Sequence, residues 1–429
     1  MSTTPGASLV VRNAAEVVTL AGQGPLRGDA LRALAPDALR ALAPDARLDI
    51  DMQDGLFAEA GDVSQGDAEL DATGCTVVPG FVDCHTHLPF FGWRADEDAA
   101  RLSGIRYETL HREEGGIFRS ARLLAEASDD EVLEFSRGLA GEMLRRGTTT
   151  FETKSGYGLG VEAELRQLRV ARRLAAEVTQ TVVTTCLAAH AIPRDRSPGE
   201  WVGEVATELL PAVAGQGLAS AVDIYVESIA FSLEHAARLS EAAAGLGLAM
   251  RMHADQLEDG QAGSFAARWG FVSADHLNHT SLPAVGDLAA SDTAAVLLPG
   301  ATFTLRQSKR PQARALIEEG AIVALASDLN PGTSPVLAMP FVMALACRVY
   351  GLRPLEALAA ATVNGAHVLG LGESVGRIAP GFRADAVVLD APSFDHVCYR
   401  PDHDAVVAVI CGGEVAHLAP GAQTRLTSF

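Results

Sequence analysis

The chain has 429 residues, 48% of them hydrophobic and 21% charged, which is enough for one large globular domain with a smaller one beside it. Its formal net charge of -20 argues against a nucleic-acid or anionic-membrane partner, because both bind basic surfaces. No apolar run reaches membrane-spanning length, the N-terminus lacks a leader pattern and the six cysteines lack Cys-x-x-Cys spacing, so we expect a cytoplasmic protein with reduced thiols.

Residues 1–76 have the pattern of a small β unit. Short apolar alternations, such as 8–12 and 75–78, are separated by turns rich in Gly and Asp, which is typical of short strands. An octapeptide at 29–36 is repeated at 37–44. Two copies are too few for a solenoid, so we expect helical turns or a surface loop there.

Residues 77–375 repeat a pattern of strand, loop and helix. The expected strands are the apolar run before His85 and the runs 148–153, 181–187, 221–226, 248–252, 271–274, 294–298 and 322–326. Helical stretches lie between them, at 130–146, 162–177, 233–246 and 311–319 among others. Eight such strands predict an α/β fold, a (β/α)8 TIM barrel, with its active site at the C-terminal ends of the strands.

Two histidines, His85 and His87, follow the first expected strand. Because strand side chains alternate between faces, both imidazoles point to the same side and can hold one metal ion. Histidines that merely sit at a rim are the alternative, and the spacing alone does not decide. Polar residues follow the other strands too, namely Glu152, Lys154, His190, Glu227, His253, Asp255, Asp275, His276, Thr302 and Asp328.

Six segments together resemble the imidazolonepropionases, the histidine-degradation enzymes of the amidohydrolase superfamily. The segments are 79–87, 154–158, 252–256, 273–277, 298–300 and 327–334. His-x-His is generic for the superfamily, whereas Lys-Ser-Gly-Tyr-Gly and Asp-Leu-Asn-Pro-Gly-Thr-Ser are more specific. The resemblance implies metal-dependent hydrolysis of the cyclic amide C-N bond of 4-imidazolone-5-propionate to N-formimino-L-glutamate.

The tail, residues 376–429, returns to short β patterns such as 386–389 and 406–410. Its first residues resemble the hairpin by which metal-dependent amidohydrolases leave their barrel and rejoin the N-terminal strands. The resemblance therefore implies one small composite β-sandwich domain from residues 1–76 and 376–429, beside a barrel of residues 77–375. We also expect a homodimer.

The resemblance also implies one divalent metal ion, zinc or iron, because the donor set suits both. The implied ligands are His85, His87, His253 and Asp328. A second metal in this superfamily is usually bridged by a carboxylated lysine at the end of strand four. The chain has only Lys154 and Lys309, and neither stands there, which favours one metal.

The implied catalytic residues are Asp328 and His276. Asp328 would accept a proton from the attacking water and pass it to the leaving nitrogen. His276 would orient or activate that water and steady the ring carbonyl. Alternatively, His276 only positions Asp328 or a metal ligand.

Substrate contacts are implied for Arg94, Tyr157, His190, Gln256, Asn330, Gly332 and Thr333. Arg94 would bind the propionate carboxylate, although a surface ion pair with Asp96 or Glu97 is its alternative, and His190 could be a core histidine. Gln256 replaces a Glu of some relatives and cannot transfer a proton, so we expect only hydrogen bonding from it. Trp93 and residues 302–304 also depart from the family pattern, which puts substrate specificity in question.

Two other functions stay open. A related amidohydrolase would open another cyclic amide or amidine, or would deaminate an aromatic ring with the same metal chemistry. A barrel without enzymatic activity would normally lack metal ligands, whereas all four implied ligands are present here.

Overall fold

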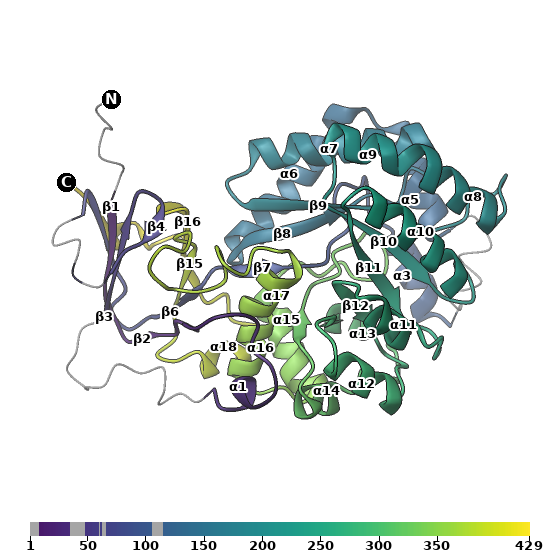
Figure 1. Cartoon of the computed structure of the whole chain (residues 1–429). Coiled ribbons are helices and arrows are strands. Elements are labelled where there is room, and N and C mark those ends of the chain that lie inside the picture. The colour runs from purple at the N-terminus through teal and green to yellow at the C-terminus, as the bar shows by residue number, and fades with distance from the viewer. Residues whose placement is uncertain (1–7, 35–47, 60, 62–65, 105–114) are drawn as a thin grey trace.

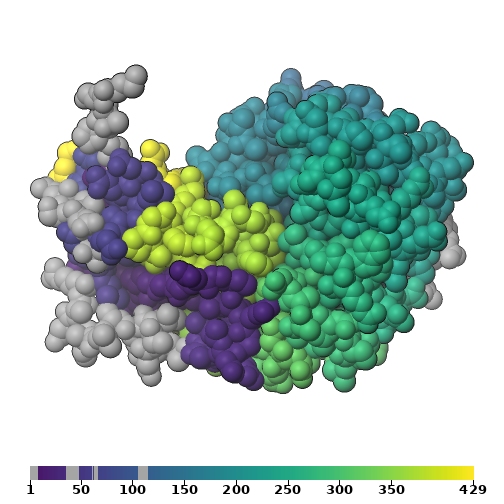
Figure 2. Space-filling view, viewed as in Figure 1, coloured from purple at the N-terminus to yellow at the C-terminus, as the bar shows by residue number. Residues whose placement is uncertain are grey.

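The computed structural model describes residues 8–34, 48–59, 61, 66–104 and 115–429. A parallel barrel surrounded by helices lies on one side of the molecule, and a unit of two β-sheets lies on the other (Figure 1). Figure 2 shows the purple N-terminal segment lying against green residues of the barrel unit, where α1 (Gly28–Arg32) packs on α14 (Ala313–Glu319) and α16 (Pro354–Ala360). The predicted barrel with a sheet domain is therefore confirmed.

Eight parallel strands form the barrel, each beside its neighbour in sequence. They are β7 (Phe81–Asp83), β8 (Thr148–Lys154), β9 (Thr181–Ala189), β10 (Ala221–Val226), β11 (Ala249–Ala254), β12 (Ser273–His276), β13 (Ala294–Leu297) and β14 (Val323–Leu325). Beyond the last and first strands, Thr86 pairs in parallel with Leu329. This pairing closes the barrel at its C-terminal mouth.

Helices cover the outside of the barrel. They are α3 (Ala95–Leu102), α5 (Ile117–Glu126), α6 (Asp129–Arg145), α7 (Val161–Glu177), α8 (Pro198–Glu204), α9 (Leu210–Gln216), α10 (Leu233–Gly245), α11 (Ala262–Trp269), α12 (Leu282–Ala289), α13 (Pro299–Thr304), α14 (Ala313–Glu319), α15 (Met339–Leu345), α16 (Pro354–Ala360) and α17 (Val363–Val368). The π-helices η1 (Val205–Leu209) and η2 (Ala346–Tyr350) continue α8 and α15. Ser128 and Glu131 form a capping box that fixes the start of α6.

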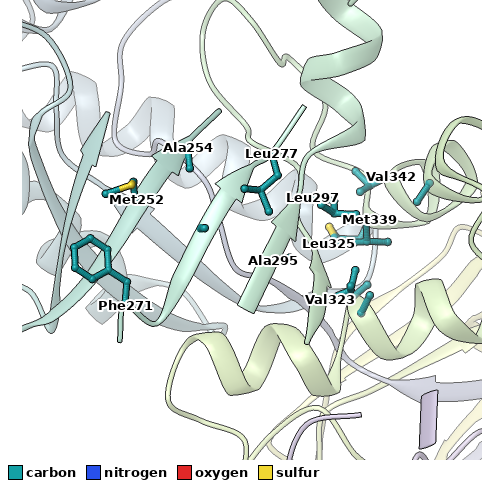
Figure 3. Close-up of a cluster of buried hydrophobic side chains, with 14 of the residues drawn as sticks. Met252, Ala254, Phe271, Leu277, Ala295, Leu297, Val323, Leu325, Met339 and Val342 are labelled. Atoms are coloured by element: carbon teal, nitrogen blue, oxygen red, sulfur yellow. The ribbon is translucent and has the colours of Figure 1, made fainter. Parts of the chain in front are cut away.

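The barrel strands alternate between an apolar outer face and a polar inner face. In β11, Met250, Met252 and Ala254 join the hydrophobic core between strands and helices. Figure 3 shows this core, in which Leu297 and Leu325 of the sheet lie near Met339 and Val342 of α15. The intervening residues of β11 face the barrel interior, so the interior receives charged side chains.

The two remaining sheets combine strands from both ends of the chain, in the orders β18-β5-β1-β3-β4 and β17-β16-β15-β6-β2. The strands are β1 (Ser8–Ala14), β2 (Glu16–Val17), β3 (Leu48–Gln53), β4 (Leu56–Phe57), β5 (Ala68–Asp71), β6 (Thr76–Pro79), β15 (Ala386–Leu389), β16 (Val406–Cys411), β17 (Glu414–Leu418) and β18 (Leu426–Ser428). The short helices α18 (Asp395–Tyr399) and η3 (Gln423–Arg425) lie between these strands. Leu9, Met52, Val77, Ala386 and Ile410 belong to a separate apolar cluster of these sheets. The composite sandwich is confirmed, while the domain boundaries at 76/77 and 375/376 stay a prediction.

The apolar run before His85 supplies strands to both units, because it divides at Gly80 into β6 and β7. A Cβ on Gly80 would lie 2.1 Å from Oγ1 of Thr149, so the close approach of the chain to β8 requires glycine here. The first octapeptide copy contains most of α1, whereas the second lies outside the described residues. In the described part of the chain, no helix is long and apolar enough to cross a membrane.

Candidate active site

The four predicted metal ligands converge at the C-terminal mouth of the barrel. His85 and His87 follow β7, His253 lies in β11, and Asp328 follows β14. The ring centroids of the three histidines are 4.5, 5.2 and 5.4 Å apart. Nε2 of His87 lies 3.5 Å from Nε2 of His253 and 3.1 Å from Oδ1 of Asp328. The structure thus brings together residues that are far apart in the sequence.

These four residues fit a divalent metal ion. Nε2 of His85 and Oδ1 of Asp328 are 3.5 Å apart, and both are buried without a hydrogen-bond partner among the described residues. Two ligand atoms on a tetrahedral zinc ion lie roughly 3.3 Å apart, given bonds of about 2.0 Å. Burial holds the pKa values of His85 and His87 well below 6.5, so both rings are neutral, which is the form that binds metal.

Buried carboxylates orient two of these imidazoles. Nδ1-H of His85 donates to Oδ2 of Asp275 over 2.5 Å, and Nδ1-H of His253 donates to Oδ1 of Asp223 over 3.1 Å. A carboxylate only accepts hydrogen bonds, so the ring hydrogen must be on Nδ1. Nε2 of each ring therefore keeps its lone pair free to bind a metal ion. Burial alone would raise the pKa of Asp223, but His253 and Lys154 hold it well below its usual range.

The two predicted catalytic residues have left-handed backbone conformations, with φ of 79° at His276 and 55° at Asp328. Such a conformation costs a non-glycine residue on the order of 1–2 kcal/mol and is concentrated at functional sites. Consecutive strand residues normally face opposite sides, yet Asp275 and His276 both face the interior. Burial lowers the pKa of His276 to about 3 and raises that of Asp328.

A pocket of about 190 Å³ opens over these side chains. It is lined by His87, His253, His276 and Asp328, by the predicted substrate residues Arg94, Tyr157, His190, Gln256, Asn330 and Thr333, and by Ile117, Tyr225, Leu257, Leu305 and Gln307. Gly332, also a predicted substrate residue, does not line the pocket and instead packs against the Arg94 guanidinium. Trp93 and residues 302–304 do not line the pocket, so their departures from the family pattern do not reach it directly.

Arg94 is buried at the pocket wall, with 3% of its side chain exposed, rather than paired on the surface. Its Nη1 lies 3.7 Å from Oε2 of Glu97, which is too far for a hydrogen bond. Among the described residues, Nε and Nη1 of Arg94 have no hydrogen-bond partner. Arg94 therefore offers donors to an anionic group in the pocket.

Histidine and tyrosine rings form one wall of the pocket. His190 stacks on His87 with ring centroids 5.1 Å apart, and its Nδ1-H donates to the carbonyl oxygen of Gly156 over 3.2 Å. The Tyr157 ring lies 5.5 Å from that of His190. These contacts fix the ring planes that a flat substrate would meet.

Asn330 is engaged with its own loop. Its Oδ1 accepts hydrogen bonds from the backbone N-H groups of Gly332 and Thr333, and its Nδ2 donates to the Asp328 carbonyl over 2.7 Å. Direct contact between Asn330 and a substrate stays a prediction.

Asp255, one of the polar residues at the strand ends, supports the backbone. Its carboxylate accepts hydrogen bonds from the backbone N-H groups of residues 260, 262 and 263, which holds the start of α11 in place.

Sequence reasoning did not single out Tyr225 and Gln307, which line the pocket. Tyr225 lies two residues after Asp223 in β10, so both side chains share the inner face of the strand. This period of two could have pointed to Tyr225 from the sequence. Gln307 follows α13, and its Nε2 donates to the Gln256 carbonyl over 3.1 Å. No local pattern marks this loop position.

Comparison with known proteins places the chain in a family. A family model described as "Amidohydrolase family" matches residues 76–417. An imidazolonepropionase of Symbiobacterium thermophilum is 41% identical over 95% of this chain and 96% of its own length. One of Rubrobacter xylanophilus is 42% identical over 97% of this chain and 100% of its own length.

Solved structures share the fold at low identity. An adenosine deaminase from Xanthomonas campestris with bound zinc has a TM-score of 0.65 and 18% identity, over 96% of this chain and 93% of its own. A guanine deaminase of E. coli has a TM-score of 0.67 and 15% identity, over 96% and 99%. The chain belongs to the amidohydrolase family and, within it, to the imidazolonepropionases.

Proposed function

We propose that this chain hydrolyses the cyclic amide C-N bond of 4-imidazolone-5-propionate to give N-formimino-L-glutamate, a step of histidine degradation. The observation that carries the proposal is the position of Arg94, buried on the wall of the pocket that holds the His and Asp cluster, with Nε and Nη1 lacking a hydrogen-bond partner among the described residues. A carboxylate arm would pair with Arg94 while the ring lies over the cluster. The relatives named imidazolonepropionase support the same reaction.

The proposed cofactor is one zinc or iron ion, held by His85, His87, His253 and Asp328. When bound, it supplies a Lewis acid that makes water a stronger nucleophile and polarises the ring carbonyl. The carboxylates of Asp223 and Asp275 hold the Nδ1 hydrogens of His253 and His85. These hydrogen bonds prepare the ligand nitrogens before any ion arrives.

Proton transfer is assigned to Asp328. Its carboxylate would take the proton of the attacking water and deliver it to the leaving ring nitrogen. The support is its buried position 3.1 Å from Nε2 of His87 and its left-handed backbone, which turns the carboxylate into the pocket. His276 lines the same pocket with Nδ1 unpaired among the described residues, and it would orient the water and the ring carbonyl.

Substrate orientation is assigned to the pocket walls. Arg94 would bind the propionate, and Tyr157 and His190 would contact the ring. Gln256 would donate or accept hydrogen bonds without transferring a proton. Gly332 and Thr333 would act through the loop that supports Arg94.

The test is to incubate the purified protein with imidazolone propionate, generated in place from urocanate, and to identify the product by mass spectrometry. Formation of N-formimino-glutamate supports the proposal. Ammonia is measured in parallel on purine and pterin substrates, because an aromatic-ring deaminase is the second candidate. Ammonia release without ring opening of the imidazolone would overturn the assignment, and opening of another cyclic amide or amidine would change only its substrate. The cytoplasmic location and the homodimer stay predictions.

A further inference from the structure

A group of buried charged side chains lies inside the barrel, beneath the pocket. They come from the inner faces of β8, β10, β11 and β12, and none is more than 2% exposed. The group consists of Glu152, Lys154, Asp223, Arg251 and Asp275. Charges buried this deeply need partners at close range, and the contacts show which partner each one has.

Lys154 connects this group to a proposed metal ligand. Its Nζ donates to Oε1 of Glu152 and to Oδ2 of Asp223, both over 2.8 Å. The other oxygen of Asp223 accepts from Nδ1-H of His253 over 3.1 Å. Only one side chain therefore separates the Lys154 ammonium from the ring of His253.

A parallel but looser branch reaches His85. Nη2 of Arg251 lies 3.8 Å from Oδ2 of Asp275, which accepts from Nδ1-H of His85 over 2.5 Å. The Arg251 guanidinium also donates to Oε1 of Glu152 and, over 2.7 Å, to the Cys84 carbonyl, so it is held mainly by contacts other than Asp275. The Lys154 branch is thus the one in which a single cation directly fixes the orienting carboxylate.

The residue type at position 154 is itself informative. The chain has 34 lysines and arginines, and only Lys154 and Lys309 are lysines. Lys309 is exposed, whereas Lys154 is fully buried. An ammonium is a compact charge whose three donors can face two carboxylates at once, while a guanidinium is a wide planar fork. The space between Glu152 and Asp223 suits the ammonium.

We propose that Lys154 is a positioning residue for the metal site. Its ammonium fixes the carboxylate of Asp223, and that carboxylate fixes the His253 ring with Nε2 toward His87. Without Lys154, Oδ2 of Asp223 loses its charged partner, and the ring loses its rigid support. The inference rests on the ligand set proposed above and does not depend on the identity of the substrate.

The experiment measures the zinc dissociation constant by competition with a chromophoric chelator. Lys154→Met should bind zinc about 10- to 100-fold more weakly than the wild type, the range found when an outer-shell partner of a ligand is removed. The matched control is Lys309→Met, which replaces the exposed lysine and should bind zinc as the wild type does.

A double-mutant cycle separates positioning from a general loss of structure. If Lys154 acts through Asp223, Lys154→Met should weaken zinc binding little or not at all in an Asp223→Asn background. The comparison is between Asp223→Asn and the double variant that also carries Lys154→Met. Neither protein has an unpaired charge at position 223, so the comparison remains informative even where Lys154→Met alone does not fold.

Three results would overturn the inference. Lys154→Met could bind zinc as tightly as the wild type. Alternatively, the loss of zinc affinity caused by Lys154→Met could add in full to the loss caused by Asp223→Asn. Lys154→Met could also bind two equivalents of zinc, the first with wild-type affinity. In that case Lys154 would serve to exclude a second cation. A wild-type chain that binds no zinc would overturn the ligand set together with this inference, whereas failure of imidazolone turnover alone would overturn only the proposed substrate.

Discussion

The guanidinium of Arg94 packs directly on the α-carbon of Gly332, so closely that a Cβ at position 332 would lie 1.9 Å from Nη2. The backbone N-H of Arg94 also donates to the carbonyl of Pro331 over 2.9 Å. The loop after β14 therefore holds both the proposed proton carrier Asp328 and the support of the proposed anion-binding arginine. Under the proposed roles, substrate binding and proton transfer would both depend on this loop.

Replacing Arg94 by Met should lower kcat/KM for imidazolone propionate by about 30-fold or more. Truncating one partner of a buried charged pair costs about 2 to 5 kcal/mol. Steady-state kinetics measure the effect, and metal content should not change. The control substrate is an imidazolone without the carboxylate: an equal loss on both compounds would mean that Arg94 supports the fold rather than the ligand.

Gly332→Ala should reproduce much of this defect without removing the cation, because the added methyl group must displace the guanidinium. We expect KM for imidazolone propionate to rise while zinc binding stays as in the wild type. Kinetics of this variant beside Arg94→Met provide the comparison. A KM equal to that of the wild type in Gly332→Ala would contradict this prediction. It would show that the loop shifts to accept the methyl group while Arg94 keeps its position.

Elemental analysis of the purified protein should give about one transition metal per chain. His253→Ala should lose the metal together with activity, because it removes one of three clustered imidazoles. Two tightly bound equivalents in the wild type would contradict the single-metal proposal.

Glu227 should make the folded state less stable as pH rises. It is 6% exposed, and burial raises its pKa from 4.5 to about 7, although its Oε1 accepts from the backbone N-H groups of Gln256 and Leu257. Its contribution is fully present below pH 4.5 and is lost as pH rises through about 7. The loss is about 3 kcal/mol, at 1.36 kcal/mol per pKa unit.

Chemical denaturation at pH 5 and pH 8 tests this for the wild type and Glu227→Gln. The wild type should lose more of its unfolding free energy between the two pH values than the variant does. Equal losses in both proteins would show that Glu227 is not the group responsible.

Truncation after residue 375 should give insoluble protein. It removes β15, which pairs with β6, and β18, which pairs with β5, so edges of both sandwich sheets lose their partners. Solubility after expression and size-exclusion chromatography measure the outcome. A soluble and active truncated chain would contradict the role of the tail in the fold.

The sequence by itself determined the order of the barrel elements. The expected helices at 130–146 and 162–177 agree with α6 and α7 to within one residue at each end, and the expected strand at 221–226 agrees with β10. These elements are read from local periodicity and from the lengths of apolar runs, which depend on neighbours in the chain. His-x-His is local in the same way.

The interior of the barrel was decided only by the tertiary structure. Alternation shows that Lys154 and Asp223 face inward, but not that two residues 69 positions apart form an ion pair across the closed barrel. The left-handed backbone that turns His276 toward the pocket also has no local signal, because packing around the residue imposes it. Side-chain partners depend on how strands from distant parts of the chain are arranged around one axis, and that arrangement exists only when the barrel has closed.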